Sequence, residues 1–96
     1  MSDLTNYNSI NDIESLYNNA VEDFKTGNYE QSENKLKYIL ELIPDNTDVL
    51  NFYGRLKQFQ NKFDDSIDLL TKSVTIDNNN FMAHYNLALA YCIKKI

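Results

Sequence analysis

Apolar side chains recur along most of the chain at intervals of three and four residues, which is the spacing of one face of an α-helix. In residues 13–26 these positions are Ile13, Leu16, Tyr17, Ala20, Val21 and Phe24. Gly27 and Asn28 interrupt the period, which resumes over residues 29–43 and stops at Pro44, because proline disfavours a helical residue before it. The pattern predicts two helices joined by a turn in which Gly27 is left-handed.

The remainder of the chain repeats this plan. Residues 47–60 and 63–76 predict a second helix pair with Asn61 at its turn, since Asn tolerates the left-handed conformation next best after Gly. Residues 77–80 form the next connection and cap a fifth helix over residues 81–94. Residues 1–12 have no apolar period and predict an irregular leader. Ser9, Asn11 and Asp12 can each cap the first helix, and Asn11 or Asp12 is best placed to do so.

A shift of 34 residues aligns the first helix pair with the second, and with the fifth helix, without a gap. The aligned positions carry similar side chains: Leu16 with Leu50, Ala20 with Gly54 and Ala88, Tyr29 with Phe63, Ser32 with Ser66, Leu36 with Leu70, Leu42 with Ile76, and Asn46 with Asn80. The repeat divides the chain into units at residues 13–46 and 47–80 and an incomplete unit at 81–96. A period of 34 is the length of a tetratricopeptide unit.

The chain resembles the tetratricopeptide repeat family over residues 13–96. The residues that carry the resemblance are a small residue where the two helices of a unit meet (Ala20, Gly54 and Ala88), an aromatic in the first turn of the second helix (Tyr29 and Phe63) and the closing Pro44. It departs where the family has an early Trp, because Leu16, Leu50 and His84 stand there, and where Asn78 replaces the second closing Pro. The resemblance implies an all-α, right-handed α-solenoid of antiparallel helix pairs, with about two and a half units and five helices.

In this family the first helices of the units line a concave groove that binds a peptide or a helix. The positions that match it here are Tyr17, Asn18, Phe52, Arg55, Phe59, Tyr85 and Asn86. Asn18 and Asn86 are similar to the asparagines that bind peptide backbone in O-linked N-acetylglucosamine transferases, since an amide both donates and accepts hydrogen bonds. The alternative is that the aromatics pack between helices and that a chain with fourteen Asn places some there by chance.

Composition narrows the classes of partner. The net charge is −5, and the nine Lys and Arg are scattered, whereas nucleic acid and anionic membranes require a basic patch. No apolar run approaches the roughly 18 residues of a membrane span, and the first residues lack the pattern of a secretory signal. A single cysteine, Cys92, agrees with the reducing cytoplasm, where we expect the protein.

The chain has no recognisable catalytic or metal-binding set. His84 and Cys92 are the only residues of their types and lie eight apart on one predicted helix. We therefore expect His84 to be a helix-packing residue and Cys92 a small apolar one. Two groups of acidic residues predict solvated helix faces or helix starts and not paired catalytic carboxylates: Asp64, Asp65 and Asp68, and Glu22 and Asp23. The sequence therefore predicts a non-catalytic protein–protein interaction module without a cofactor or metal.

The predicted last helix is apolar on every side, as its sequence FMAHYNLALAYCIKKI shows. A terminal helix normally has a polar face that is exposed to solvent. We expect Leu87 and Tyr91 to form a surface for continuation into further repeats, in a longer protein of which this chain is a fragment. The alternatives are a homo-oligomer formed through this helix, or the substrate-recruiting segment of a larger enzyme such as a glycosyltransferase.

Overall fold

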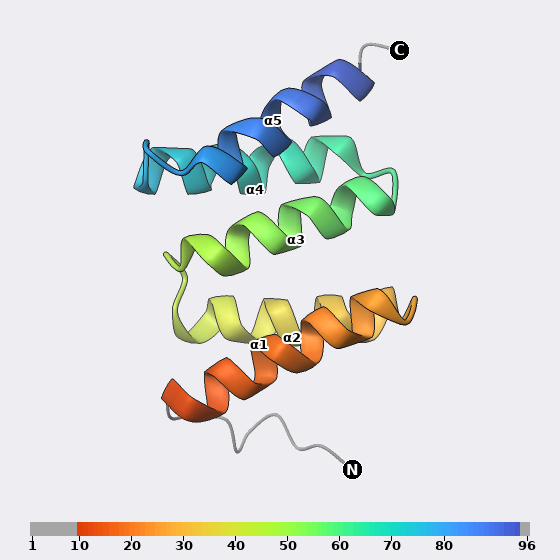
Figure 1. Ribbon diagram of the computed structural model, residues 1–96, viewed down its shortest axis with the longest axis vertical. Helices are drawn as coiled ribbons and strands as arrows, with labels where there is room; N and C mark the ends of the chain where they lie inside the picture. The colour runs from red at the N-terminus through yellow and green to blue at the C-terminus, as the bar shows by residue number, and fades with distance from the viewer. Residues whose placement is uncertain (1–9, 95–96) are drawn as a thin grey trace. The chain divides into compact units, whose positions relative to one another are not determined.

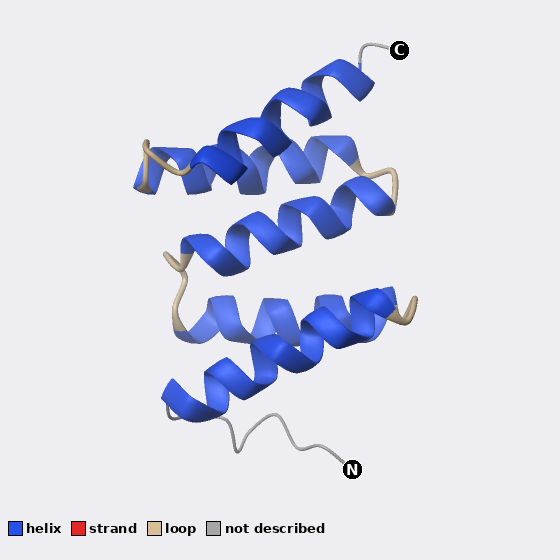
Figure 2. Ribbon diagram, viewed as in Figure 1, coloured by secondary structure: helices blue, strands red, loops and turns tan. Residues whose placement is uncertain are grey.

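The computed structural model describes residues 10–94, in which there are five α-helices and no β-strand (Figure 2). The helices are α1 (Ile10–Lys25), α2 (Tyr29–Leu42), α3 (Thr47–Phe59), α4 (Phe63–Ile76) and α5 (Phe81–Lys94). They form two compact bodies (Figure 1). The N-terminal body, Met1–Pro44, contains the α1–α2 hairpin, and the C-terminal body, Asp45–Ile96, contains the α3–α4 hairpin and α5. The all-α class and the five helices are thus confirmed.

The helix boundaries agree with the predicted ones to within one residue, except at the start of α1. This helix begins at Ile10, so Asn11 and Asp12 lie inside it and the prediction that one of them caps it was wrong. Asp12 stands in the first turn, where its carboxylate complements the helix dipole. Ile10 lies three residues before Ile13, so the apolar spacing continues through this extra turn. The rest of the expected leader, residues 1–9, lies outside the described residues.

Both hairpins use the same turn. Gly27 has φ of 85° and Asn61 has φ of 61°, as the sequence predicted for this pair of equivalent positions. The amide of Asn28 donates to the carbonyl of Asp23 at 2.8 Å, and the amide of Lys62 donates to the carbonyl of Lys57 at 2.9 Å. These bonds, from the residue after the left-handed one back to the last helical turn, define a Schellman motif that ends the helix and reverses the chain.

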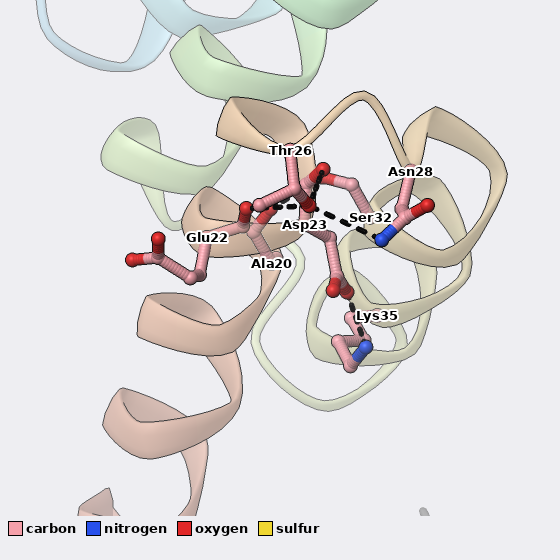
Figure 3. Close-up of polar contacts among 7 residues, drawn as sticks. All are labelled: Ala20, Glu22, Asp23, Thr26, Asn28, Ser32 and Lys35. Atoms are coloured by element: carbon pink, nitrogen blue, oxygen red, sulfur yellow. Dashed lines mark hydrogen bonds and ion pairs between the residues drawn. The ribbon is translucent and has the colours of Figure 1, made fainter.

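A buried hydrogen bond links the two helices of each hairpin. Ser32 Oγ donates to the carbonyl of Ala20 at 2.7 Å (Figure 3), and Ser66 Oγ donates to the carbonyl of Gly54 at 2.7 Å. Both serines are fully buried. The 34-residue repetition seen in the sequence is therefore also a repetition of contacts.

The small residue at each crossing lets the helix backbones approach closely. A Cβ atom built on Gly54 would lie 2.7 Å from Leu70 Cγ and 2.8 Å from Leu70 Cδ2, distances that real Cβ atoms do not show. Leu70 is fully buried and has little freedom to move aside. The α3–α4 separation thus requires glycine at this position.

In the C-terminal body, α3 and α5 begin with the same cap. Asn46 Oδ1 accepts from the amide of Val49 at 3.0 Å, and Asn80 Oδ1 accepts from the amide of Ala83 at 3.0 Å. Each side chain satisfies an amide that the helix itself leaves without a partner. The predicted cap of the fifth helix is confirmed, and it is a third feature that repeats after 34 residues.

The fully buried side chains are mainly leucines, and α5 adds only small residues to the interior. The largest buried apolar side chains are Leu16, Leu36, Ile39, Leu50, Leu56 and Leu70, whereas the buried residues of α5 are Ala83, Asn86 and Ala90. Ser73 departs from the repeat, because its equivalent in α2 is the fully buried Ile39. Ser73 Oγ is buried and has no hydrogen-bond partner in the described part of the chain.

Two serine substitutions on α4 should therefore have different effects. We expect Ser66→Ala to lower the free energy of unfolding by about 1 kcal/mol, because it removes a satisfied buried hydrogen bond. Ser73→Ala should leave it unchanged or raise it by up to about 1 kcal/mol, because it removes an unpartnered buried hydroxyl. Urea denaturation measures both values. An equal loss for the two variants would contradict the roles assigned to the hydroxyls.

Gly54→Ala tests the close approach of α3 and α4. The forced contact with Leu70 should cost about 1–3 kcal/mol and outweigh the gain of up to about 1 kcal/mol in helix propensity, giving a net loss of stability. Ala88→Gly is the matched control, since it measures helix propensity at an exposed equivalent position. The opposite result would be a gain in unfolding free energy for Gly54→Ala that equals the loss measured for Ala88→Gly. It would show that the crossing has room for a methyl group.

Candidate peptide-binding surface

Helices α3 and α5, the first helices of successive repeat units, pack against each other in the C-terminal body. Gln58 Nε2 on α3 donates a partly buried hydrogen bond of 2.8 Å to the backbone carbonyl of Asn86 on α5. This bond fixes how the two helices lie along each other. Gln58 is not among the predicted peptide-binding residues, although an amide side chain on a helix face that meets a neighbouring helix is the signal that could have identified this contact.

The α3 part of the surface combines two aromatic rings and a cation. Phe52, Arg55 and Phe59 lie at intervals of three and four residues, and therefore on one side of the helix. Phe52 is half-buried, Arg55 is exposed, and the ring of Phe59 is 52% exposed. The guanidinium carbon of Arg55 lies 5.9 Å from the centroid of the Phe59 ring, within the range of a cation–π contact.

The α5 part of the surface is an apolar stripe. Tyr85 is 54% exposed, and the residues at helical spacing beside it, Met82, Leu89 and Ile93, are also exposed. Together with Phe59 they give the C-terminal body exposed aromatic and aliphatic side chains on two helices that touch. We call the set Phe52, Arg55, Phe59, Met82, Tyr85, Leu89 and Ile93 the α3–α5 surface.

Asn86 is not available in the way the resemblance implied. Its side chain is only 7% exposed, because it shares the inward side of α5 with Ala83 and Ala90. In the N-terminal body, Tyr17 is half-buried and Asn18 is exposed on α1. Two asparagines were predicted to bind peptide backbone. The side-chain amide of Asn18 is exposed at the surface, whereas that of Asn86 is almost completely buried.

Polar contacts at the end of α1 correct the expectation that Asp23 is merely solvated. Asp23 forms an ion pair with Lys35 of α2, and its side chain is only 21% exposed (Figure 3). Thr26 Oγ1 donates at the carbonyls of Glu22 and Asp23, at 3.2 and 3.1 Å, and accepts from Asn28 Nδ2 at 3.1 Å (Figure 3). This cluster reinforces the α1–α2 turn and has a structural role.

His84 and Cys92 are both exposed in the described part of the chain. His84 Nε2 lies 2.8 Å from the carbonyl oxygen of Asn78, and because a carbonyl only accepts, Nε2 is the donor. No cluster of three or more His, Cys, Asp and Glu in residues 10–94 is arranged to hold a metal ion.

An ion pair joins the end of α5 to the start of α4. The hydrogen bond to the Asp64 carboxylate raises the pKa of Lys94 above its ordinary value of 10.5. Because the pKa is raised on folding, the stabilisation linked to the protonation of Lys94 is fully present just below pH 10.5 and is lost as the pH rises through the raised pKa. The contact is exposed to solvent, so its contribution is small.

No family model matches the chain, and no curated protein matches it significantly. None of the helices within residues 10–94 combines the length and the apolar character needed to cross a membrane. The chain is an all-α protein whose helix hairpins repeat their contacts every 34 residues.

Removing the α3–α5 hydrogen bond should loosen α5. In Gln58→Ala, we expect amide hydrogens in residues 83–90 to exchange about fivefold faster, which corresponds to the roughly 1 kcal/mol of a typical hydrogen bond. Hydrogen–deuterium exchange with mass spectrometry measures the change. Gln31→Ala, at an exposed position on α2, is the control and should leave α5 unaffected. Unchanged exchange in Gln58→Ala would show that the bond does not hold α5 in place.

Proposed function

We propose that this chain is a non-catalytic protein–protein interaction module of the tetratricopeptide type, with its helix pairs stacked as a right-handed solenoid. The repeated turn, the repeated serine bond and the repeated cap support the proposal, because each recurs at the tetratricopeptide period. The site of binding is the α3–α5 surface. The observation that carries this assignment is the exposure of Phe59 and Tyr85 on two helices in contact.

The chemistry of the α3–α5 surface favours an amphipathic peptide or helix. Exposed aromatic rings supply much apolar area with few rotatable bonds, which is why they act as anchors at interfaces. Arg55 beside Phe59 adds a cation with several donors, suited to a carboxylate or to backbone carbonyls at the edge of a bound segment. Apolar burial supplies most of the affinity, and Arg55 fixes the orientation.

In the N-terminal body we assign Tyr17 and Asn18 a corresponding role on α1. Asn18 is the asparagine proposed to bind peptide backbone, because its side chain is exposed. Asn86 supports the surface through the bond that its carbonyl accepts from Gln58. We place the protein in the cytoplasm, where an exposed Cys92 stays reduced.

Selection from a displayed library of random 12-residue peptides tests the proposed function. Peptides that bind the wild-type chain should bind Phe59→Ala and Tyr85→Ala about tenfold or more weakly, because anchor aromatics dominate binding energy. Both side chains are more than half exposed, so thermal unfolding should hardly change.

Phe81→Ala is the matched control. This aromatic residue is 77% exposed on the same helix but lies outside the α3–α5 surface, so binding should persist. If no peptide is enriched over background, or if the enriched peptides bind Phe59→Ala and Tyr85→Ala as tightly as the wild type, the α3–α5 surface is not the site.

A further inference from the structure

Helix α5 has a second exposed side, which is centred on Ala88. Its other members are Phe81, His84, Tyr91 and Cys92, which all lie within about 60° of Ala88 around the helix and are all exposed. We call these five residues the Ala88 face. It adjoins the α3–α5 surface at Tyr85, which lies about 60° from Ala88, whereas Met82, Leu89 and Ile93 lie about 100° or more from Ala88 around the helix. The inference below does not depend on the proposed function. Leu87, which the sequence grouped with Tyr91, is half-buried and borders this face.

The equivalent face is covered in both complete hairpins. Ala20 and Gly54, which match Ala88, are buried beneath α2 and α4 respectively. Leu16 and Leu50, which match His84, are also buried. Within residues 10–94, α5 is thus the only first helix of a repeat unit whose crossing position is open.

The chain itself shows twice which kind of helix covers such a face. The covering helix carries an aromatic residue in its first turn, a serine three residues later and a leucine four residues after that: Tyr29, Ser32 and Leu36 in α2, and Phe63, Ser66 and Leu70 in α4. The serine hydroxyl donates to the carbonyl of the small residue at 2.7 Å in both hairpins. In the α3–α4 hairpin, the leucine packs directly against the small residue.

The aromatic residue also has a defined contact. The Tyr29 ring lies 5.4 Å, centroid to centroid, from the ring of Phe24, and Cys92 is the residue of α5 that matches Phe24. A helix seated in the same register on α5 would therefore place its aromatic over the small, exposed Cys92. The space left by replacing Phe with Cys favours a bulky aromatic at this position of the incoming helix.

We propose that the Ala88 face docks a helix of a partner protein that carries the pattern aromatic-x-x-Ser-x-x-x-Leu. The serine hydroxyl of that helix donates to the backbone carbonyl of Ala88, its leucine packs on the Ala88 methyl group, and its aromatic covers Cys92. The small residue admits the close approach, and burial of Phe81 and Tyr91 supplies apolar contact area.

His84 is the residue of the Ala88 face that fits this interface least well. A leucine stands in its place in both covered faces, whereas the His84 ring is polar and held by the carbonyl of Asn78. Replacing His84 by leucine makes the face match the two covered ones. The variant should therefore bind the docking helix more tightly than the wild type does.

The probe is a synthetic peptide with the sequence of α4, residues 63–76. A 14-residue helix is marginal in water, so the peptide is closed by a lactam between Asp68 and Lys72, two exposed residues one turn apart. We expect saturable binding to the full chain by fluorescence anisotropy. Replacing the peptide residue Ser66 by leucine should weaken binding about tenfold or more, since it removes the donor and overpacks the crossing.

Substitutions in the protein test the face itself. Ala88→Lys should also weaken binding about tenfold or more, whereas Met82→Lys should not, because the residues that match Met82, Glu14 and Asp48, stay exposed in the complete hairpins. His84→Leu should tighten binding about threefold or more through added apolar burial. Circular dichroism should show an unchanged fold for Ala88→Lys, since the position is exposed.

Three results would overturn the proposal. One is the absence of saturable binding of the lactam peptide, and another is equal affinity for the wild type and Ala88→Lys. The third is sedimentation of the wild-type chain as a dimer that Ala88→Lys converts to a monomer, because the occupant of the face would then be a second copy of this chain.

Discussion

The close crossing of the two helices in each hairpin determines most of the remaining structure. A small residue on the first helix lets the backbones approach, and a serine hydroxyl of the second helix bonds the carbonyl that becomes reachable. Because the bond joins residues 12 apart in both hairpins, it also sets the register of one helix against the other. The leucine over the crossing and the positions of the buried leucines follow from that register.

Helix α5 shows what the same kind of helix looks like when its crossing position is not covered. Its sequence follows the repeat, with Ala88 where Ala20 and Gly54 stand, yet Ala88 is exposed and so are most of the large apolar side chains around it. The buried residues of α5 are two alanines and Asn86, so the helix packs closely on its neighbours. Most of its large apolar side chains are exposed to solvent. Exposed apolar surface of this extent on a small protein is typical of interaction sites.

Both candidate surfaces are built on helices and not on loops. The α3–α5 surface is held by the Gln58 bond to the Asn86 carbonyl, and the start of α5 is fixed by the Asn80 cap. The ion pair between Asp64 and Lys94 joins the other end of α5 to α4. Side chains on such a framework lose little conformational freedom when a partner binds, which favours recognition by shape and apolar burial.

The sequence by itself determined the helices, their turns, the cap at Asn80 and the 34-residue repetition. These features follow from local physics: apolar period, the left-handed conformation at Gly27 and Asn61, and the side-chain chemistry of a cap. It failed at the start of the first helix, which begins at Ile10, one turn before the predicted start at Ile13. The tertiary structure alone decided that Asn86 is buried and that His84 and Cys92 are exposed. It also decided two contacts, the ion pair between Asp23 and Lys35 and the hydrogen bond by which Gln58 joins α3 to α5. The physical reason is that α5 is apolar on nearly every side, so its sequence does not specify which side a neighbouring helix will cover, and each of these outcomes depends on which helices come into contact.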